Sequence, residues 1–431
     1  MAKIDWYLEF VDEDYLPNAD DIVALFYFEP GNGISKKEAA GRIASESSTG
    51  TWTTLATLPP RMRKLMAKVY ELNGNFAKIA YPIELWEEAN APQLLAGLAG
   101  NIFGMKAIKN LRLLDAKFPP KYLKSFKGPT KGIQGVRKLM GIKNRPLTGA
   151  VPKPKIGFSS LEHSQIAYET WMGGFDLVKD DENLTSVTFN KFEERVALME
   201  RMREKAEKAT GDKKDALINI TAPVEVMEKR AKLLYESGFG FAMIDVVVAG
   251  TSAVQYMREI LEDYGMAIHA HRAMHASFDR NPKHGISMLF LAKLMRLIGV
   301  DQLHAGTGVG KLVGRKDEIK AISDVLREKR VKAVENLLLE QNWGNIKPAL
   351  PVSSGGLHPG LIPDVIKLFG TDCVILVSGG IHGHPDGTRA GAKAAMDAIY
   401  ATLDGISLEE ASKKSNALAK ALQKWGHFKP K

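Results

Sequence analysis

Cysteine is almost absent from this sequence, in which Cys373 is the only such residue among 431. An intrachain disulfide is therefore impossible, and a metal site built from several cysteines is excluded. A long apolar run is missing too, because Lys293 and Arg296 interrupt the most apolar stretch, residues 286–300. A membrane span needs roughly 20 apolar residues, so we interpret this stretch as a buried helix and expect no membrane partner.

Signals for secretion and for nucleic-acid binding are also missing. Early acidic residues break up any apolar core of a signal peptide, and we expect a cytoplasmic protein. The net charge is +9, but the basic residues are dispersed in segments such as 201–214 and 320–332, without the aromatic residues that stack on bases. Nucleic acid is therefore a weak candidate, and the charge suits either a solvated surface or an anionic small molecule.

The length of the chain exceeds one typical compact core and predicts either two domains or a barrel with an attached domain. From about residue 146 onward, short β-branched segments alternate with longer helical ones, which is typical of βα units and a parallel sheet. The predicted strands number eight and span residues 147–153, 175–179, 216–221, 242–248, 266–271, 302–305, 349–354 and 373–378. Eight such strands close a (β/α)8 TIM barrel.

The helices between these strands carry start and stop signals of their own. Ser159 and Glu162 form a candidate capping box before an apolar helical pattern. Residues 224–237 are amphipathic and stop at Gly238, the kind of residue that commonly follows a helix. These signals place helices after the first and the third predicted strands.

Residues 1–127 lack this alternation and predict a smaller α+β domain of the ferredoxin-like type. The elements expected in it are strands at 22–28 and 76–81, a helix that begins near Ser35, and a helix through Leu94 and Leu95. The turn-rich residues 127–130 make a plausible joint. We therefore divide the chain into an N-terminal domain, residues 1–127, and a barrel with a C-terminal helical tail, residues 128–431.

Reactive side chains gather where the predicted strands end, which is where the active site of a (β/α)8 barrel lies. The residues at these ends are Lys153 and Lys155, 179–182, His269, His271 and Arg272, His304, 353–356 and 378–380. Each alone has a structural explanation, since a lone lysine is usually solvated and a lone histidine is usually a core residue. Their occurrence at six strand ends favours a catalytic site.

Asp181 and Glu182 are candidate ligands for a metal ion. Carboxylate oxygens at the mouth of a barrel suit Mg²⁺, and a third anionic ligand is normally wanted. Lys179 carries the wrong charge for that role unless its amine, deprotonated in a partly desolvated site, adds CO2 and becomes a carbamate. The alternative is a simple salt bridge between Lys179 and Asp181, which the residues alone favour.

Residues 174–183, with the sequence GFDLVKDDEN, resemble the activator segment of the large subunits of ribulose-1,5-bisphosphate carboxylase/oxygenase (RuBisCO). The resemblance covers essentially the whole chain. Its further motifs are ESSTGTW at 46–52, GNIFG at 100–104, HRAMH at 271–275 and GTGVGK at 306–311. The sequence HPG at 358–360 and the short C-terminus make the chain most similar to the archaeal form III members.

The resemblance implies an enzyme that adds CO2 or O2 to the enediolate of ribulose 1,5-bisphosphate and gives 3-phosphoglycerate. It also implies a Mg²⁺ ion held by Asp181, Glu182 and a modified Lys179. That lysine would carry an activating CO2 as N6-carboxylysine, and its carbamate would be a candidate base for the first proton.

The catalytic residues of the family correspond to Lys153, His271 and Lys311. Lys153 would handle the protons of the enediol and the final protonation, and His271 would contact the substrate hydroxyls. Lys311 would swing over the bound CO2 on a flexible loop and stabilise the new carboxylate. The implied substrate-binding residues are Lys155, Arg272, His304, Ser354, Gly355, Gly356, Gly379 and Gly380, with the last two at one phosphate.

Glu46, Thr51, Trp52 and Asn101 match family residues that complete the active site of the neighbouring subunit. The resemblance therefore implies a homodimer or an assembly of dimers, without a small subunit. A monomer should be inactive.

The chain departs from the family pattern in two places. Val151 and Pro152 stand where Thr-Ile usually precedes the first catalytic lysine, and residues 378–381 read SGGI where three successive glycines are usual. We expect altered affinity and CO2/O2 discrimination rather than lost activity. The nearest alternative is a RuBisCO-like enolase or isomerase that acts on a related sugar phosphate without carboxylation. The residues that argue against it are Lys153, Lys311, Glu46 and Trp52.

Overall fold

The computed structural model describes residues 5–53, 58–309 and 316–428. Its backbone contacts divide the described chain into two compact units. The first unit comprises residues 1–127, 274–298 and 328–346, and the second comprises 128–273, 299–327 and 347–431. Two segments from the later part of the sequence therefore pack with the N-terminal residues.

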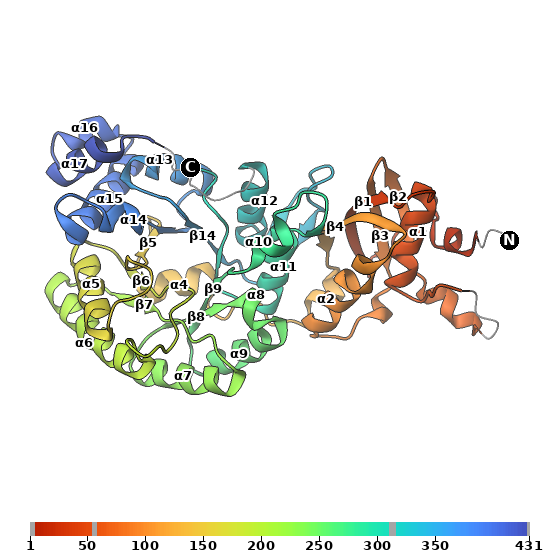
Figure 1. Ribbon diagram of the computed structural model, residues 1–431, viewed down its shortest axis with the longest axis horizontal. Coiled ribbons are helices and arrows are strands. Elements are labelled where there is room, and N and C mark those ends of the chain that lie inside the picture. The colour runs from red at the N-terminus through yellow and green to blue at the C-terminus, as the bar shows by residue number, and fades with distance from the viewer. Residues whose placement is uncertain (1–4, 54–57, 310–315, 429–431) are drawn as a thin grey trace. The chain divides into compact units, whose positions relative to one another are not determined.

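The second unit is built on a barrel of parallel strands (Figure 1). Among the described residues its eight strands are β5 (Leu147–Ala150), β6 (Leu177–Lys179), β7 (Asp215–Leu217), β8 (Phe241–Asp245), β9 (Ala267–His271), β11 (Gln302–His304), β14 (Leu350–Ser354) and β15 (Val374–Leu376). Their order is β7-β6-β5-β15-β14-β11-β9-β8, and a parallel bridge between Asn219 and Met243 nearly closes the ring. Every predicted strand overlaps one of these strands, so the predicted barrel is confirmed.

Helices follow the strands, and Figure 1 shows α5, α6, α7 and α9 on the outer side of the barrel. The main helices of this unit are α5 (Ser160–Met172), α6 (Phe192–Thr210), α7 (Val224–Glu236), α9 (Thr251–Asp263), α12 (Lys316–Arg327), α13 (Ile362–Phe369), α15 (Gly387–Leu403), α16 (Leu408–Ser412) and α17 (Asn416–Trp425). The predicted capping box of Ser159 and Glu162 begins α5, and α7 ends as predicted before Gly238. Three predicted strands run too far at their carboxyl ends. Residues 151–153 are not part of β5 and residues 218–221 are not part of β7. Residues 246–249 form the short helix α8 (Val246–Ala249) instead of extending β8.

Buried carboxylates hold the amino-terminal ends of the strands. Each accepts a backbone N–H from the start of a neighbouring strand or from the residue just before it. The pairs are Asp176 with Thr148, Asp215 with Gly240, and Asp301 with Ile268. At the same end, the apolar face of α4 (Gly132–Met140) packs on buried residues of the strands. These contacts fix the register of the strands at their amino-terminal ends. The carboxyl ends remain available for functional side chains.

The first unit contains a sheet with the βαββαβ order of a ferredoxin-like domain. Its elements are β1 (Ile22–Pro30), α1 (Lys36–Glu46), β2 (Lys68–Asn73), β3 (Phe76–Tyr81), α2 (Ala91–Ala99) and β4 (Ile108–Lys117). The strands lie in the order β4-β1-β3-β2 with antiparallel neighbours, and β10 (Gly285–Ile286) is a parallel edge strand beside β4. The predicted α+β fold is confirmed, and Ser35 caps the predicted first helix.

Helix α11 (Met288–Ile298) is buried along its whole length, as the sequence predicts, but its two charged residues are buried as well. Lys293 forms an ion pair with Asp115 at 2.7 Å, with both side chains fully buried. Arg296 donates to two backbone carbonyls of the segment 328–346, which belongs to the first unit. That segment includes the short strands β12 (Arg330–Val331) and β13 (Gln341–Asn342). Neither α11 nor any other helix in the described ranges is long and apolar enough to cross a membrane.

Candidate active site

A cavity of about 520 Å³ lies at the carboxyl ends of the barrel strands. Its walls are formed by Val151, Lys153, Lys155, Lys179, Asp181, Glu182, His271, His304, Ser354, Gly355, Gly356, Leu376, Ser378 and Gly379. These residues end strands β5, β6, β9, β11, β14 and β15 or follow them directly. The fold thus brings together most of the predicted site residues. Val151, Leu376 and Ser378 also line the cavity, although no catalytic or binding role was predicted for them.

Lys179 is buried at the end of β6, with only 1% of its surface exposed. Its ammonium donates to the backbone carbonyl of Asp180 at 2.8 Å instead of forming a salt bridge with Asp181. Burial is the dominant influence on this amine and lowers the pKa of Lys179, against the opposing effect of nearby carboxylates. A lowered pKa increases the fraction of neutral amine, which is the form that can add CO2.

Asp181 and Glu182 face lysine side chains from the loop after β5. The Oδ2 atom of Asp181 lies 3.3 Å from Lys153 Nζ, and the Oε1 atom of Glu182 lies 3.5 Å from Lys155 Nζ. Burial also lowers the pKa of Lys153, with Asp181 opposing the effect. The Nε2 atom of His271 lies 3.9 Å from Glu182 Oε2. The cavity therefore holds two carboxylates surrounded by groups that can exchange protons.

Asp180, between Lys179 and Asp181 in the sequence, is held by a separate buried network. Its Oδ2 atom accepts from Arg195 Nε at 3.2 Å and from a backbone N–H at 3.0 Å, and His163 Nε2 lies 3.2 Å from its Oδ1 atom. Burial by itself raises the pKa of Asp180, but Arg195 and His163 lower it overall. Asp180 is therefore an ionised residue that joins the end of β6 to helices α5 and α6. Its contacts fix the backbone from which Lys179 and Asp181 extend.

A chain of hydrogen bonds leads through two buried histidines to Ser354. Gln302 Oε1 lies 2.7 Å from His269 Nδ1, the Nε2 atoms of His269 and His304 are 3.0 Å apart, and His304 Nδ1 lies 2.7 Å from Ser354 Oγ. Burial lowers the pKa of both histidines well below its usual value, so both rings are neutral. With the amide oxygen placed at His269, that ring carries its proton on Nδ1 and His304 carries its proton on Nε2. The Ser354 hydroxyl then donates to His304, and its lone pairs remain for a ligand.

Glycine turns place backbone N–H groups beside the cavity. Gly355 and Gly356 follow β14 with φ angles of 114° and 72°, in the region that favours glycine. Gly379 and Gly380 begin the short helix α14 (Gly379–His382) after β15, and a Cβ at Gly380 would lie 2.4 Å from a backbone carbonyl. Arg272 is buried directly after β9. Neither Arg272 nor Gly380 is among the lining residues, although both are predicted site residues.

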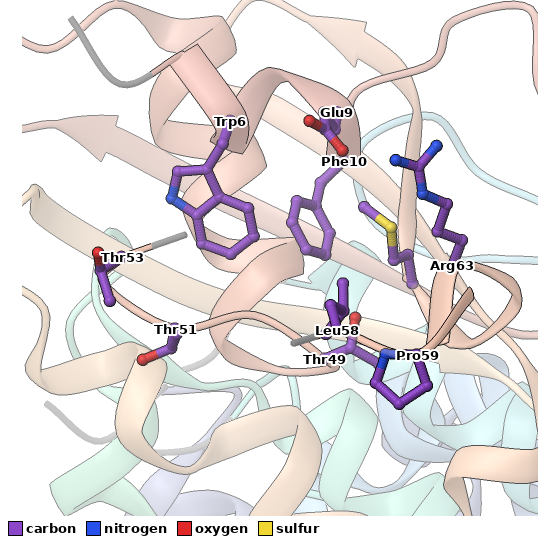
Figure 2. A pocket seen from close by; sticks show the side chains of 10 residues that line it. Trp6, Glu9, Phe10, Thr49, Thr51, Thr53, Leu58, Pro59 and Arg63 are labelled. Carbon is purple, nitrogen blue, oxygen red and sulfur yellow. The ribbon is translucent and has the colours of Figure 1, made fainter. Parts of the chain in front are cut away.

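The remaining predicted site residues are one catalytic lysine and four residues of the first unit. The lysine, Lys311, lies outside the described residues. Glu46, Thr51, Trp52 and Asn101 belong to the first unit, where Trp52 is 80% exposed. Figure 2 shows Thr51 at a second hollow of that unit, with a volume of about 260 Å³.

The residues of the barrel cavity fit a metal ion on one condition. In the part of the chain that the structure describes, no group of three or more His, Cys, Asp or Glu side chains is arranged to hold a metal. Asp181 and Glu182 supply two hard oxygen donors of the kind that Mg²⁺ prefers. A carbamate on Lys179 would supply a third anionic donor. The residues therefore fit Mg²⁺ when that lysine is modified.

Two family models match the chain over most of its length. Residues 9–122 match the ribulose bisphosphate carboxylase large chain, N-terminal domain, and residues 132–425 match the ribulose bisphosphate carboxylase large chain, catalytic domain. The chain is 58% identical over 433 residues to the ribulose bisphosphate carboxylase of Pyrococcus abyssi, covering 100% of this chain and 99% of the relative. It is 49% identical over 440 residues to that of Archaeoglobus fulgidus, covering 100% of both.

Solved structures agree with these matches. The octameric ribulose-1,5-bisphosphate carboxylase/oxygenase from Pyrococcus horikoshii superposes with a TM-score of 0.91 at 56% identity, covering 98% of each chain. The dimeric archaeal Rubisco from Hyperthermus butylicus superposes with a TM-score of 0.93 at 50% identity, covering 98% of this chain and 100% of that one.

Proposed function

Since the chain belongs to the family of ribulose bisphosphate carboxylase large chains, as its motifs predict, we propose that it adds CO2 or O2 to the enediolate of D-ribulose 1,5-bisphosphate. The family is a carboxylase/oxygenase, and the chain is an enzyme of that class. Carboxylation would form a bond between CO2 and C2 of the five-carbon enediolate. Addition of water at C3 and cleavage of the C2–C3 bond would then yield two molecules of 3-phosphoglycerate. The observation that carries the proposal is a buried lysine, Lys179, beside Asp181 and Glu182 at the carboxyl ends of a barrel.

A modified Lys179 is the first element of the proposal. The lone pair of its neutral amine forms an N–C bond to CO2 and one proton leaves to solvent, which gives a carbamate anion. This carbamate, Asp181 and Glu182 would hold Mg²⁺. When bound, the ion would act as a Lewis acid toward substrate oxygens. The lowered pKa of the Lys179 amine supports the modification.

Lys153 and His271 carry the proposed proton chemistry. The carbamate of Lys179 is the candidate base for the C3 proton, and Lys153 transfers protons at the enediol and protonates the final carbanion. The lowered pKa of Lys153 supports this role, because a lysine nearer neutrality can both accept and donate a proton. Lys155 supports Lys153, His271 contacts the substrate hydroxyls, and Lys311 stabilises the new carboxylate.

The two phosphates of the substrate need two anion sites. We assign one of them to Arg272, His304, Ser354, Gly355 and Gly356. The other falls to Gly379 and Gly380, after the eighth strand, where barrels commonly bind phosphate. The backbone N–H groups of the two glycine turns support both assignments.

We propose that the active enzyme is a homodimer or an assembly of dimers, without a small subunit. Similar solved structures include a dimer and an octamer. Glu46, Thr51, Trp52 and Asn101 of one subunit would complete the site of its partner. Their exposed or half-buried positions on the first unit suit such a contact.

The test is to incubate the purified protein with CO2 and Mg²⁺, add ribulose 1,5-bisphosphate with labelled CO2, and measure labelled 3-phosphoglycerate. Lys179→Ala should abolish the label while the circular dichroism spectrum stays that of the wild type. Lys208→Ala, which removes an exposed lysine of α6, is the matched control and should keep the label. Turnover by Lys179→Ala would refute the metal site. A wild-type protein that exchanges the C3 proton without forming label would instead be the RuBisCO-like enolase or isomerase.

A further inference from the structure

The main chain just before Lys153 is tethered by the end of a different strand. The Val151 N–H donates to Ser378 Oγ at 3.0 Å, and the Val151 carbonyl accepts from His382 Nε2, also at 3.0 Å. Ser378 precedes α14 and His382 ends it, so both tethers come from the single helical turn after β15. This turn therefore holds both polar groups of the Val151 backbone.

The direction of these bonds fixes the state of His382. A carbonyl oxygen only accepts, so the Nε2 atom of His382 carries the hydrogen. The Nδ1 atom lies 3.0 Å from Thr388 Oγ1 and accepts the proton of that hydroxyl. Burial lowers the pKa of His382 to about 4, and the nearby ammonium of Lys153 acts in the same direction. The ring is therefore neutral, with a fixed orientation, near pH 7.

The local sequence leaves this stretch few other tethers. Residues 151–154 read VPKP, and a proline has no backbone N–H to donate. Val151 and Lys153 therefore hold the backbone donors of these four residues. The Lys153 side chain is 33% exposed and its amine reaches the cavity next to Asp181. A shift of the Val151 backbone would therefore move the Lys153 backbone, and the Lys153 side chain has enough space in the cavity to move with it.

We propose that Ser378 and His382 are positioning residues, which hold the Val151 backbone and thereby set the place of the Lys153 amine in the cavity. The proposal rests on the proposed function for the acid–base role of Lys153, but the tether itself stands on the contacts alone. It gives one physical account of both departures from the family pattern. Pro152 removes a donor beside Val151, and Ser378 supplies a hydroxyl where a run of glycines is usual.

The tether is tested on the full chain, without substrate or metal, by trace acetylation with acetic anhydride at one fixed pH. Mass spectrometry of the digest gives the relative labelling rate of Lys153. His382→Leu has no donor for the Val151 carbonyl, so this rate should change severalfold. His382→Gln can place an amide N–H close to the position of Nε2 and should restore the wild-type rate. The exposed Lys208, read from the same digest, is the internal control.

A second readout separates positioning from general structural damage. In the labelled-CO2 assay, His382→Leu should lower kcat by roughly 10–100-fold, as a small misplacement of a catalytic group does, with little change in KM. His382→Gln should recover most of it. Ser378→Ala removes the acceptor of the Val151 N–H, and its Lys153 labelling rate serves as the test where His382→Leu fails to fold.

Equal Lys153 labelling in the wild type, His382→Leu and Ser378→Ala would overturn the tether. Unequal labelling with unchanged kcat would overturn the positioning role. A wild-type protein without carboxylation would sink the proposed function instead, while the labelling comparison would still decide the tether.

Discussion

Replacing Lys293 with Met should destabilise the first unit far more than replacing Lys117, a surface lysine of β4. Lys293 Nζ lies 2.7 Å from Asp115 Oδ2, both side chains are fully buried, and the amine also donates to the carbonyls of Ala116 and Leu339. Burial raises the pKa of Asp115 and lowers the pKa of Lys293. Desolvation therefore works against both charges, and each depends on the other.

The expected loss in unfolding free energy depends on which buried polar groups each variant leaves without a partner. Lys293→Met leaves an uncompensated carboxylate in the interior, which costs about 3–5 kcal/mol. Lys293→Met combined with Asp115→Leu removes both charges and leaves backbone groups without their partners, chiefly the Leu339 N–H that donates to Asp115 at 2.7 Å. One unsatisfied buried group costs about 1–3 kcal/mol. The double variant should therefore be no less stable than either single variant.

Native-state hydrogen exchange is the suitable assay, because a chain of two units need not unfold in one transition. The amide protons of residues 336–342 report the opening of the segment that Lys293 holds. Lys117→Met is the matched control, because Lys117 and Glu340 join β4 to the same segment at 2.6 Å with side chains 40% and 67% exposed. Its cost should stay below about 1 kcal/mol. A double variant that costs the sum of the two single variants would refute the reasoning.

Two further predictions concern buried carboxylates. Burial raises the pKa of Asp215 to about 7, so the folded state binds this proton more tightly than the unfolded chain does, and stability should fall as the pH rises from about 4 to about 7. Asp215→Asn should flatten that part of the profile of unfolding free energy against pH, and an unaltered slope would contradict the assignment. Arg195→Met removes the guanidinium that pairs with Asp180, so Mg²⁺ affinity in bicarbonate, measured by calorimetry, should fall roughly 10–100-fold. Arg195→Lys should lose less, and equal affinity in all three proteins would exclude the anchoring role.

The barrel could be predicted from the sequence because each strand is a short apolar run between amphipathic helices. The membership of residues 274–298 and 328–346 in the first unit could not. This membership depends on which residues Lys293 and Arg296 contact. A charged residue in an apolar run gives the same sequence pattern whether its side chain is solvated or buried against a partner. The end of β8 was missed for a related reason, since the β-branched residues after Asp245 favour a strand locally while the chain already turns into a helix.

The charged residues of the cavity could be predicted because parallel strands bring their carboxyl ends to one rim. The positioning contacts could not be predicted, because Val151 and His382 are 231 positions apart and no pattern in the sequence links the two residues. The two prolines around Lys153 were the available signal, since they leave residues 151–154 with few backbone donors of their own.

Asp180 and Asp181 are adjacent and chemically identical, yet their contacts give them opposite uses. Asp180 faces a buried guanidinium, a backbone N–H and an imidazole, all of which are fixed by the fold. Asp181 accepts from Asn183 of its own loop through Oδ1, and its charged partners are the amines of Lys153 and Lys155, which end long side chains on the wall of a cavity. A carboxylate with fixed partners cannot give them up without local unfolding, whereas one paired with mobile amines can exchange them for a cation at little cost in desolvation. Such an exchange at Asp181 would release the same lysines that the proposed proton chemistry requires.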